Sequence, residues 1–165
     1  MSVIAVRKTQ SEITIAADSL MVSGHLKHQT SGIKFSKIIA SNGVTIGTAG
    51  DASELVLMEI FCTDNHPKSE DREGVLQFIV DFQNWAKEKQ DDFAAENSYI
   101  FVFSSGAFLV PVPLEVYEIN EFEAIGSGGE HAKVAMRLGL NPVEACKIAC
   151  EFCIYCAEPI ISYSV

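Results

Sequence analysis

The chain has 165 residues, 48% of them hydrophobic, and a formal net charge of −10 at pH 7. This length and apolar content predict a single globular domain over residues 1–165 with a sizeable core. The acidic balance excludes nucleic acids as expected partners, and with neither a long apolar run nor a signal-peptide pattern we expect a cytoplasmic protein.

The first third of the chain has the pattern of β-strands. Val3–Val6 is a short apolar run and Ile13–Ala17 is rich in β-branched residues, so we expect these segments to form a hairpin. Ile33–Ala40 and Val44–Ala49 form a second predicted pair, because Ser41-Asn42-Gly43 between them is a turn signal.

Two helices are predicted next. Asp51 followed three residues later by Glu54 resembles a capping box, which predicts a helix beginning at about Asp51 and containing the apolar stretch Leu55–Cys62. From about Asp71, apolar residues recur at helical spacing, with acidic residues at the start of the segment and lysines at its end. We expect this pair to cover one face of the sheet.

Further strands are predicted before the last third of the chain. Tyr99–Phe103 and Ala107–Val112 alternate around Ser104-Ser105-Gly106, and Phe122–Ile125 forms another apolar segment. A second sheet is therefore plausible.

The last third returns to helix. One helix is predicted after Gly126–Gly129 and ends at Gly139, and a second begins with a cap at Asn141 and runs from Val143 to Tyr155. We expect this second helix to be buried, since it is apolar nearly all round, and a short strand over Ile160–Tyr163 to follow it. This element order predicts an α+β fold, a four-layer αββα sandwich with two antiparallel sheets between helix pairs.

Four of the five cysteines lie in the apolar segment 145–157, and the fifth is Cys62. Buried, reduced thiols on a helix in a reducing compartment explain them best. The spacing of Cys146, Cys150 and Cys153 also matches an iron–sulfur pattern, but such a cluster needs a loop. We therefore expect no metal and no cofactor.

Four short motifs occur in the order and at the spacing found in the proteasome β-type subunits. They are Ala16-Ala17-Asp18-Ser19, Gly47-Thr48-Ala49-Gly50, Ala124-Ile125-Gly126-Ser127-Gly128-Gly129 and Cys153-Ile154-Tyr155. The chain thus resembles this family of N-terminal nucleophile hydrolases and, within it, the bacterial ATP-dependent peptidase subunit HslV. The resemblance implies a peptidase acting on peptides or unfolded proteins, a homo-oligomeric ring and an unfolding ATPase as partner.

The resemblance also implies the catalytic residues. Removal of Met1 would place a terminal α-amine beside the Ser2 hydroxyl, and an amine with an ordinary pKa of about 7.7 to 8.0 can accept the hydroxyl proton near neutral pH. Lys34 matches the family's lysine, whose charge would lower the proton affinity of the amine and hydroxyl, and Asp18 is its natural counter-ion. The alternative for Asp18 and Lys34 is a solvated pair at the strand ends.

Two further residues complete the predicted site. Gly50 precedes the helix predicted from Asp51, so its N–H suits a developing oxyanion, although Gly50 could equally serve only to turn the chain. Ser127 matches a family serine that hydrogen-bonds the N-terminal amine, and otherwise it is a helix cap. Thr48 lies where the family lines its specificity pocket.

Two other functions fit the same sequence. The family nucleophile is normally threonine, and a chain that keeps Met1 would be a catalytically inactive structural subunit of the same fold. Alternatively, the Ser2 chemistry could hydrolyse the amide of a small molecule.

Overall fold

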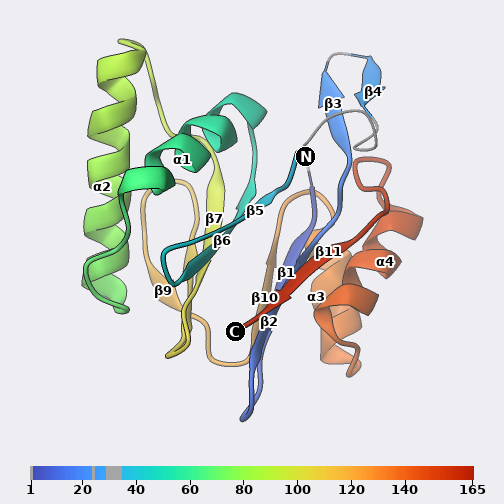
Figure 1. The fold of residues 1–165 in the computed structure, drawn as a ribbon. Coiled ribbons are helices and arrows are strands. Elements are labelled where there is room, and N and C mark those ends of the chain that lie inside the picture. The colour runs from blue at the N-terminus through green and yellow to red at the C-terminus, as the bar shows by residue number, and fades with distance from the viewer. Residues whose placement is uncertain (1, 24, 29–34) are drawn as a thin grey trace.

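Four layers make up the fold in the computed structural model, which describes residues 2–23, 25–28 and 35–165 (Figure 1). One sheet has the strand order β10 (Phe122–Ile125), β1 (Ile4–Lys8), β2 (Ile13–Ala17) and β11 (Ile161–Ser164). The other has the order β5 (Ile38–Ser41), β6 (Val44–Ala49), β7 (Ser98–Val102), β8 (Ala107–Val110) and β9 (Tyr117–Glu118). All neighbouring strands are antiparallel.

A helix pair covers the outer face of each sheet. Helices α1 (Ala52–Asp64) and α2 (Arg72–Lys89) lie on the five-stranded sheet, and α3 (Gly129–Arg137) and α4 (Pro142–Phe152) lie on the four-stranded sheet (Figure 1). Strands β3 (Met21–Ser23) and β4 (Leu26–His28) form a separate hairpin beside the N-terminal end of β1. The predicted αββα sandwich is confirmed.

Three apolar cores separate the four layers. Aromatic residues, among them Phe61, Phe78 and Phe82, fill the space between the five-stranded sheet and its helices. Small residues, mainly alanine and cysteine, pack α3 and α4 closely on the other sheet. Between the sheets, a Cβ atom on Gly47 would lie 2.7 Å from Cγ2 of Ile4, so this glycine lets the two backbones approach.

The predicted ends of several elements are confirmed. Asp71 accepts a hydrogen bond from the Gly74 N–H and caps α2, and the side chain of Asn141 forms a full capping box with Glu144 at the start of α4. Asn42 and Gly43 have positive φ, as a tight hairpin turn between β5 and β6 requires.

The capping box predicted at the start of α1 is wrong. Asp51 does cap the helix, since its carboxylate accepts a hydrogen bond from the Ser53 N–H at 2.8 Å. Glu54 instead turns inward, is only 3% exposed, and accepts hydrogen bonds from the backbone N–H groups of Glu96 and Asn97. Burial with these donors outcompetes the local cap.

The predicted burial of the last helix is also wrong in part. Helix α4 ends at Phe152, and Cys153 is its C-cap. Phe152 at the end of α4 is 68% exposed, because the sheet and α3 cover only part of this helix, and Ile154 beyond it is 75% exposed. In addition, the sequence pattern did not reveal the short strands β3 and β9, which have three and two residues.

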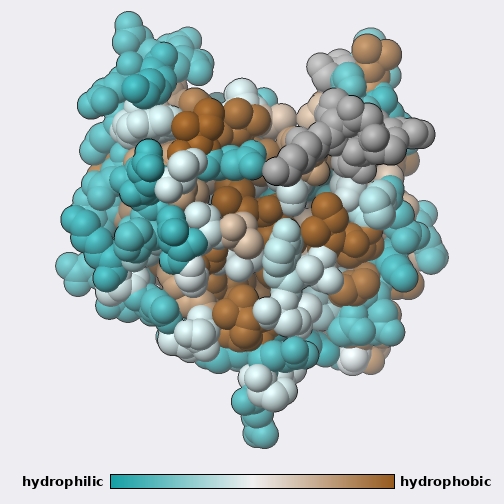
Figure 2. All heavy atoms as spheres, viewed as in Figure 1, coloured by the Kyte–Doolittle hydropathy of each residue, from teal (hydrophilic) through white to brown (hydrophobic). Residues whose placement is uncertain are grey.

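On the face seen in Figure 2, hydrophilic residues surround a central region that is more hydrophobic. Viewed as in Figure 1, hydrophilic residues cover the outer side of α2, and apolar residues show between the two helix pairs (Figure 2). In the described part of the chain, none of the helices is both long enough and apolar enough to cross a membrane.

Candidate active site

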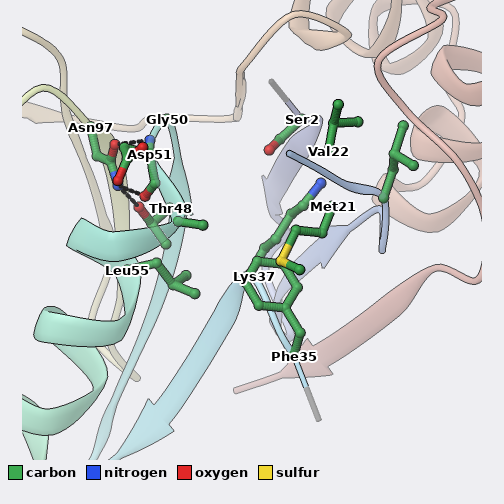
Figure 3. A pocket seen from close by; sticks show the side chains of 12 residues that line it. Ser2, Met21, Val22, Phe35, Lys37, Thr48, Gly50, Asp51, Leu55 and Asn97 are labelled. Atoms are coloured by element: carbon green, nitrogen blue, oxygen red, sulfur yellow. Dashed lines mark hydrogen bonds between the residues drawn. The ribbon is translucent and has the colours of Figure 1, made fainter. Parts of the chain in front are cut away.

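A cavity of about 390 Å³ opens beside the N-terminal end of β1. This volume lies within the range of small-ligand sites. Its walls come from the start of β1, the segment after β2, the segment before β5 and the turn between β6 and α1. The lining residues are Ser2, Leu20, Met21, Val22, Phe35, Lys37, Thr48, Gly50, Asp51, Ala52, Leu55 and Asn97 (Figure 3).

Asp18 organises the wall formed by β1 and β2. It directly follows β2 and is 1% exposed. One carboxylate oxygen accepts from the Val3 N–H at 2.9 Å and from the Lys37 ammonium at 2.7 Å. The other accepts from the N–H groups of Leu20 and Ala157, both at 3.1 Å. Four donors thus converge on one buried carboxylate.

The lysine that the structure brings to Asp18 is Lys37. The predicted residue, Lys34, lies outside the described residues, so the predicted Asp18–Lys34 pair is replaced by an observed Asp18–Lys37 pair. The Lys37 side chain is 4% exposed and the Asp18 side chain is fully buried. This is a buried ion pair and not the solvated surface pair that was the alternative.

The strand register could have identified Lys37. Counting back along the β5–β6 ladder from the Asn42–Gly43 turn, the Ser41↔Val44 and Ile38↔Gly47 pairs lead to Lys37 opposite Thr48. The Lys37 carbonyl indeed accepts a hydrogen bond from the Thr48 N–H at 3.0 Å.

Ser2 lies at the cavity with its backbone held in place. Its carbonyl accepts a hydrogen bond from the Gly128 N–H at 3.0 Å, and the residue is 3% exposed. Gly126 has a φ of +89°, and a Cβ atom there would lie 2.3 Å from the Ser2 carbonyl oxygen. Figure 3 shows the Ser2 hydroxyl and the Lys37 ammonium turned toward the same space.

Ser127 lies in the turn between these two glycines and is exposed. The turn therefore contacts the Ser2 main chain through Gly126 and Gly128, which lie on either side of Ser127. The structure brings Ser127 into the neighbourhood of Ser2.

Gly50 lies on the opposite wall, between the end of β6 and the N-cap of α1. A Cβ atom on Gly50 would lie 1.9 Å from Oδ1 of Asn97, so only glycine fits there. Asn97 and Glu54 support this wall from behind. Sequence reasoning missed Asn97, because a polar residue before a strand has no pattern of its own, and it assigned Glu54 to a capping box.

All five cysteines are free, and four of them are buried. Burial raises the pKa of Cys62 to about 12 and that of Cys150 to about 12, and it raises the pKa of Cys146 further. All five thiols are reduced. Within the described ranges, no cluster of three His, Cys, Asp or Glu side chains could hold a metal ion.

Comparison with known proteins places this geometry in context. No family model and no curated protein matches the sequence. Among solved structures, Thiobacillus denitrificans BPH in complex with epoxomicin matches with a TM-score of 0.88 and 21% identity, over 99% of this chain and 97% of that one. Eukaryotic HslV from Trypanosoma brucei matches with a TM-score of 0.70 and 22% identity, over 98% of each chain.

The chain has the proteasome-like fold of the N-terminal nucleophile hydrolases. Anbu, the ancestral beta-subunit from Yersinia bercovieri, has it too, with a TM-score of 0.74 and 11% identity over 98% of this chain and 80% of that one. At such identities the likeness is one of fold. The role of each residue in this proteasome-like chain has to be argued from its own site.

Proposed function

We propose that this protein is a proteasome-like N-terminal nucleophile peptidase whose nucleophile is Ser2 after removal of Met1. The observation that carries the proposal is the buried Asp18–Lys37 pair, whose ammonium faces the same cavity as the Ser2 hydroxyl. A buried ammonium beside a hydroxyl has few structural uses, because desolvating two charges costs several kcal/mol per ion.

The acylation step uses both functional groups of Ser2. The α-amine takes the hydroxyl proton, directly or through water, while Oγ attacks the peptide carbonyl carbon. The new Oγ–C bond gives a tetrahedral oxyanion. When this collapses, the C–N bond breaks, the leaving amine takes the proton from the α-ammonium, and an ester on Ser2 remains.

The deacylation step repeats this chemistry with water. The α-amine accepts a proton from water, the hydroxide attacks the ester carbonyl, and Oγ leaves and regains the proton. Lys37 transfers no proton in either step, and its ammonium is paired with the Asp18 carboxylate 2.7 Å away. Its positive charge lowers the proton affinity of the neighbouring amine and hydroxyl.

Gly50 and Ser127 complete the proposed machinery. The Gly50 N–H, at the cavity wall facing Ser2, would donate to the oxyanion. Ser127, in the turn that contacts the Ser2 main chain, would hydrogen-bond the α-amine and orient its lone pair.

The expected substrates are peptides and unfolded proteins, and the expected assembly is a homo-oligomeric ring with an unfolding ATPase as partner. Likeness to HslV and to an ancestral beta-subunit supports this part of the proposal.

Peptide hydrolysis together with an intact mass tests the proposal. We expect the purified protein to lack Met1 and to cleave a library of fluorogenic peptides. Ser2→Ala should abolish cleavage, Lys37→Met should lower kcat by at least about 100-fold, and Ser2→Thr should retain activity because it keeps the hydroxyl and the amine. A protein that keeps Met1 and cleaves no peptide would be a structural subunit, and cleavage undiminished in Ser2→Ala would reject the nucleophile.

A further inference from the structure

The turn that contains Gly50 is held by a buried side chain from the next strand of the sheet. Asn97 directly precedes β7 and is 3% exposed. Its Nδ2 donates to the Asp51 carbonyl at 2.9 Å and to Oγ1 of Thr48 at 3.2 Å, and its Oδ1 accepts from the Asp51 N–H (Figure 3). The amide thus binds Asp51, directly after Gly50, and Thr48, two residues before it.

These contacts fix the orientation of the backbone at Gly50. One rigid amide binds both backbone groups of Asp51, and these belong to two successive peptide planes. The plane that joins Gly50 to Asp51 is held by the hydrogen bond from the Asp51 N–H to Asn97 Oδ1, and the following plane by the hydrogen bond from Asn97 Nδ2 to the Asp51 carbonyl. Asn97 also packs so closely on Gly50 that no side chain fits between them. The neighbouring peptide, which carries the Gly50 N–H, is restrained through the same Cα.

Asn97 is in turn held by Glu54 from the first turn of α1. The Glu54 carboxylate accepts from the N–H of Asn97 at 3.2 Å, from that of Glu96 at 2.9 Å, and from the Tyr99 hydroxyl. Burial, followed by the charge of Glu54, raises the pKa of Tyr99, so this hydroxyl stays a donor. No lysine or arginine forms an ion pair with Glu54 in the part of the chain that the structure describes.

We propose that Asn97 is a positioning residue for catalysis, backed by Glu54, which aims the Gly50 N–H at the oxyanion formed on Ser2. This inference rests on the proposed function and deepens it. Asn97 cannot serve as the oxyanion donor itself, because both Nδ2 donors are already used by Asp51 and Thr48. It acts through the backbone of Gly50.

Such a role affects the transition state more than substrate binding. Removing an oxyanion donor altogether costs about 100- to 1000-fold in kcat. Displacing one should cost less, so we expect Asn97→Ala and the isosteric Asn97→Asp to lower kcat by about 10- to 100-fold while KM changes by less than about 3-fold. Asn97→Asp keeps an acceptor for the Asp51 N–H but faces the Asp51 carbonyl with a carboxylate oxygen.

The experiment measures kcat and KM separately for wild type, both Asn97 variants, Glu54→Gln and a control. The control is Asn65→Ala, which removes an amide that donates to the Phe61 carbonyl at the other end of α1, away from the cavity. Hydrogen exchange of the Asp51 amide reports on the turn without requiring activity, and it should be faster in Asn97→Ala and unchanged in Asn65→Ala.

The outcomes separate the two hypotheses. An active wild type whose Asn97 variants keep kcat within about 2-fold overturns the positioning role and leaves the peptidase intact. Equal losses in Asn97→Ala and Asn65→Ala also overturn it, because they would reflect general destabilisation. A wild type that cleaves no peptide overturns the proposed function, and the catalytic role of Asn97 with it.

Discussion

Asp18→Asn should strongly destabilise this protein. The Asp18 carboxylate accepts four hydrogen bonds, and an asparagine amide would turn a donor toward two of those four donors. It would also leave the Lys37 ammonium, 4% exposed, without a counter-ion. Breaking a buried ion pair on one side costs about 3 to 5 kcal/mol. For a domain of this size, 1 kcal/mol corresponds to about 2 to 4 °C, so Tm should fall by roughly 6 to 20 °C.

Thermal unfolding of a double-mutant cycle measures this effect. Adding Lys37→Met to Asp18→Asn removes the unpaired ammonium, so the double variant should be less destabilised than the sum of the single variants, by about 1 to 3 kcal/mol. The control is Lys133→Met. Nζ of Lys133 lies 2.6 Å from Oε1 of Glu123, but the two side chains are 36% and 25% exposed, so losing this ion pair should cost at most about 1 kcal/mol. Additive single effects, or an Asp18→Asn shift below about 2 °C, would refute the reasoning.

Two further predictions concern the turn at Ser2 and the thiols. Gly126→Ala should destabilise the protein more than Gly139→Ala and should also abolish any Ser2 chemistry. Both glycines have positive φ, but only at Gly126 would a Cβ atom meet the Ser2 carbonyl. Equal losses of Tm in thermal unfolding of the two variants would argue against this contact. Iodoacetamide at pH 8 should leave Cys62 and Cys150 unmodified in the folded protein and modify both in denaturant, since a pKa of about 12 leaves roughly one thiol in 10⁴ ionised at that pH and the fraction rises as pH rises. Peptide mapping that finds equal modification in both states would contradict this burial.

The layer architecture was predictable because its signals are local. Alternating apolar residues, caps such as Asp71 and Asn141, and the Asn42–Gly43 turn each specify one element, and their order limits the ways in which the elements can pack. Glu54 shows where this reasoning fails. A capping glutamate and a buried glutamate look identical in sequence, and the donors that decide between them, the N–H groups of Glu96 and Asn97, are about forty residues away along the chain.

The site was predictable in part. Ser2 and Gly50 line the cavity, and Asp18 accepts a hydrogen bond from the N–H of Val3, the residue after Ser2. Their catalytic roles are proposals. The predicted lysine, Lys34, lies outside the described residues, and composition does not distinguish it from Lys37 in one short segment. The ladder register draws attention to Lys37, which pairs with Asp18. Asn97 was not predictable, since its role depends on a contact across the sheet that no local pattern encodes.

The central claim is that Ser2 presents a hydroxyl and a terminal amine beside Lys37. A peptide that carries an epoxyketone has two electrophilic carbons, so one residue with a hydroxyl and an adjacent amine can react with both. Mass-spectrometric mapping after incubation with a peptide epoxyketone should find a single adduct on an N-terminal peptide that begins with Ser2, and none in Ser2→Ala. An unmodified wild type whose N-terminal peptide still begins with Met1, or an adduct at any other residue, would contradict the account.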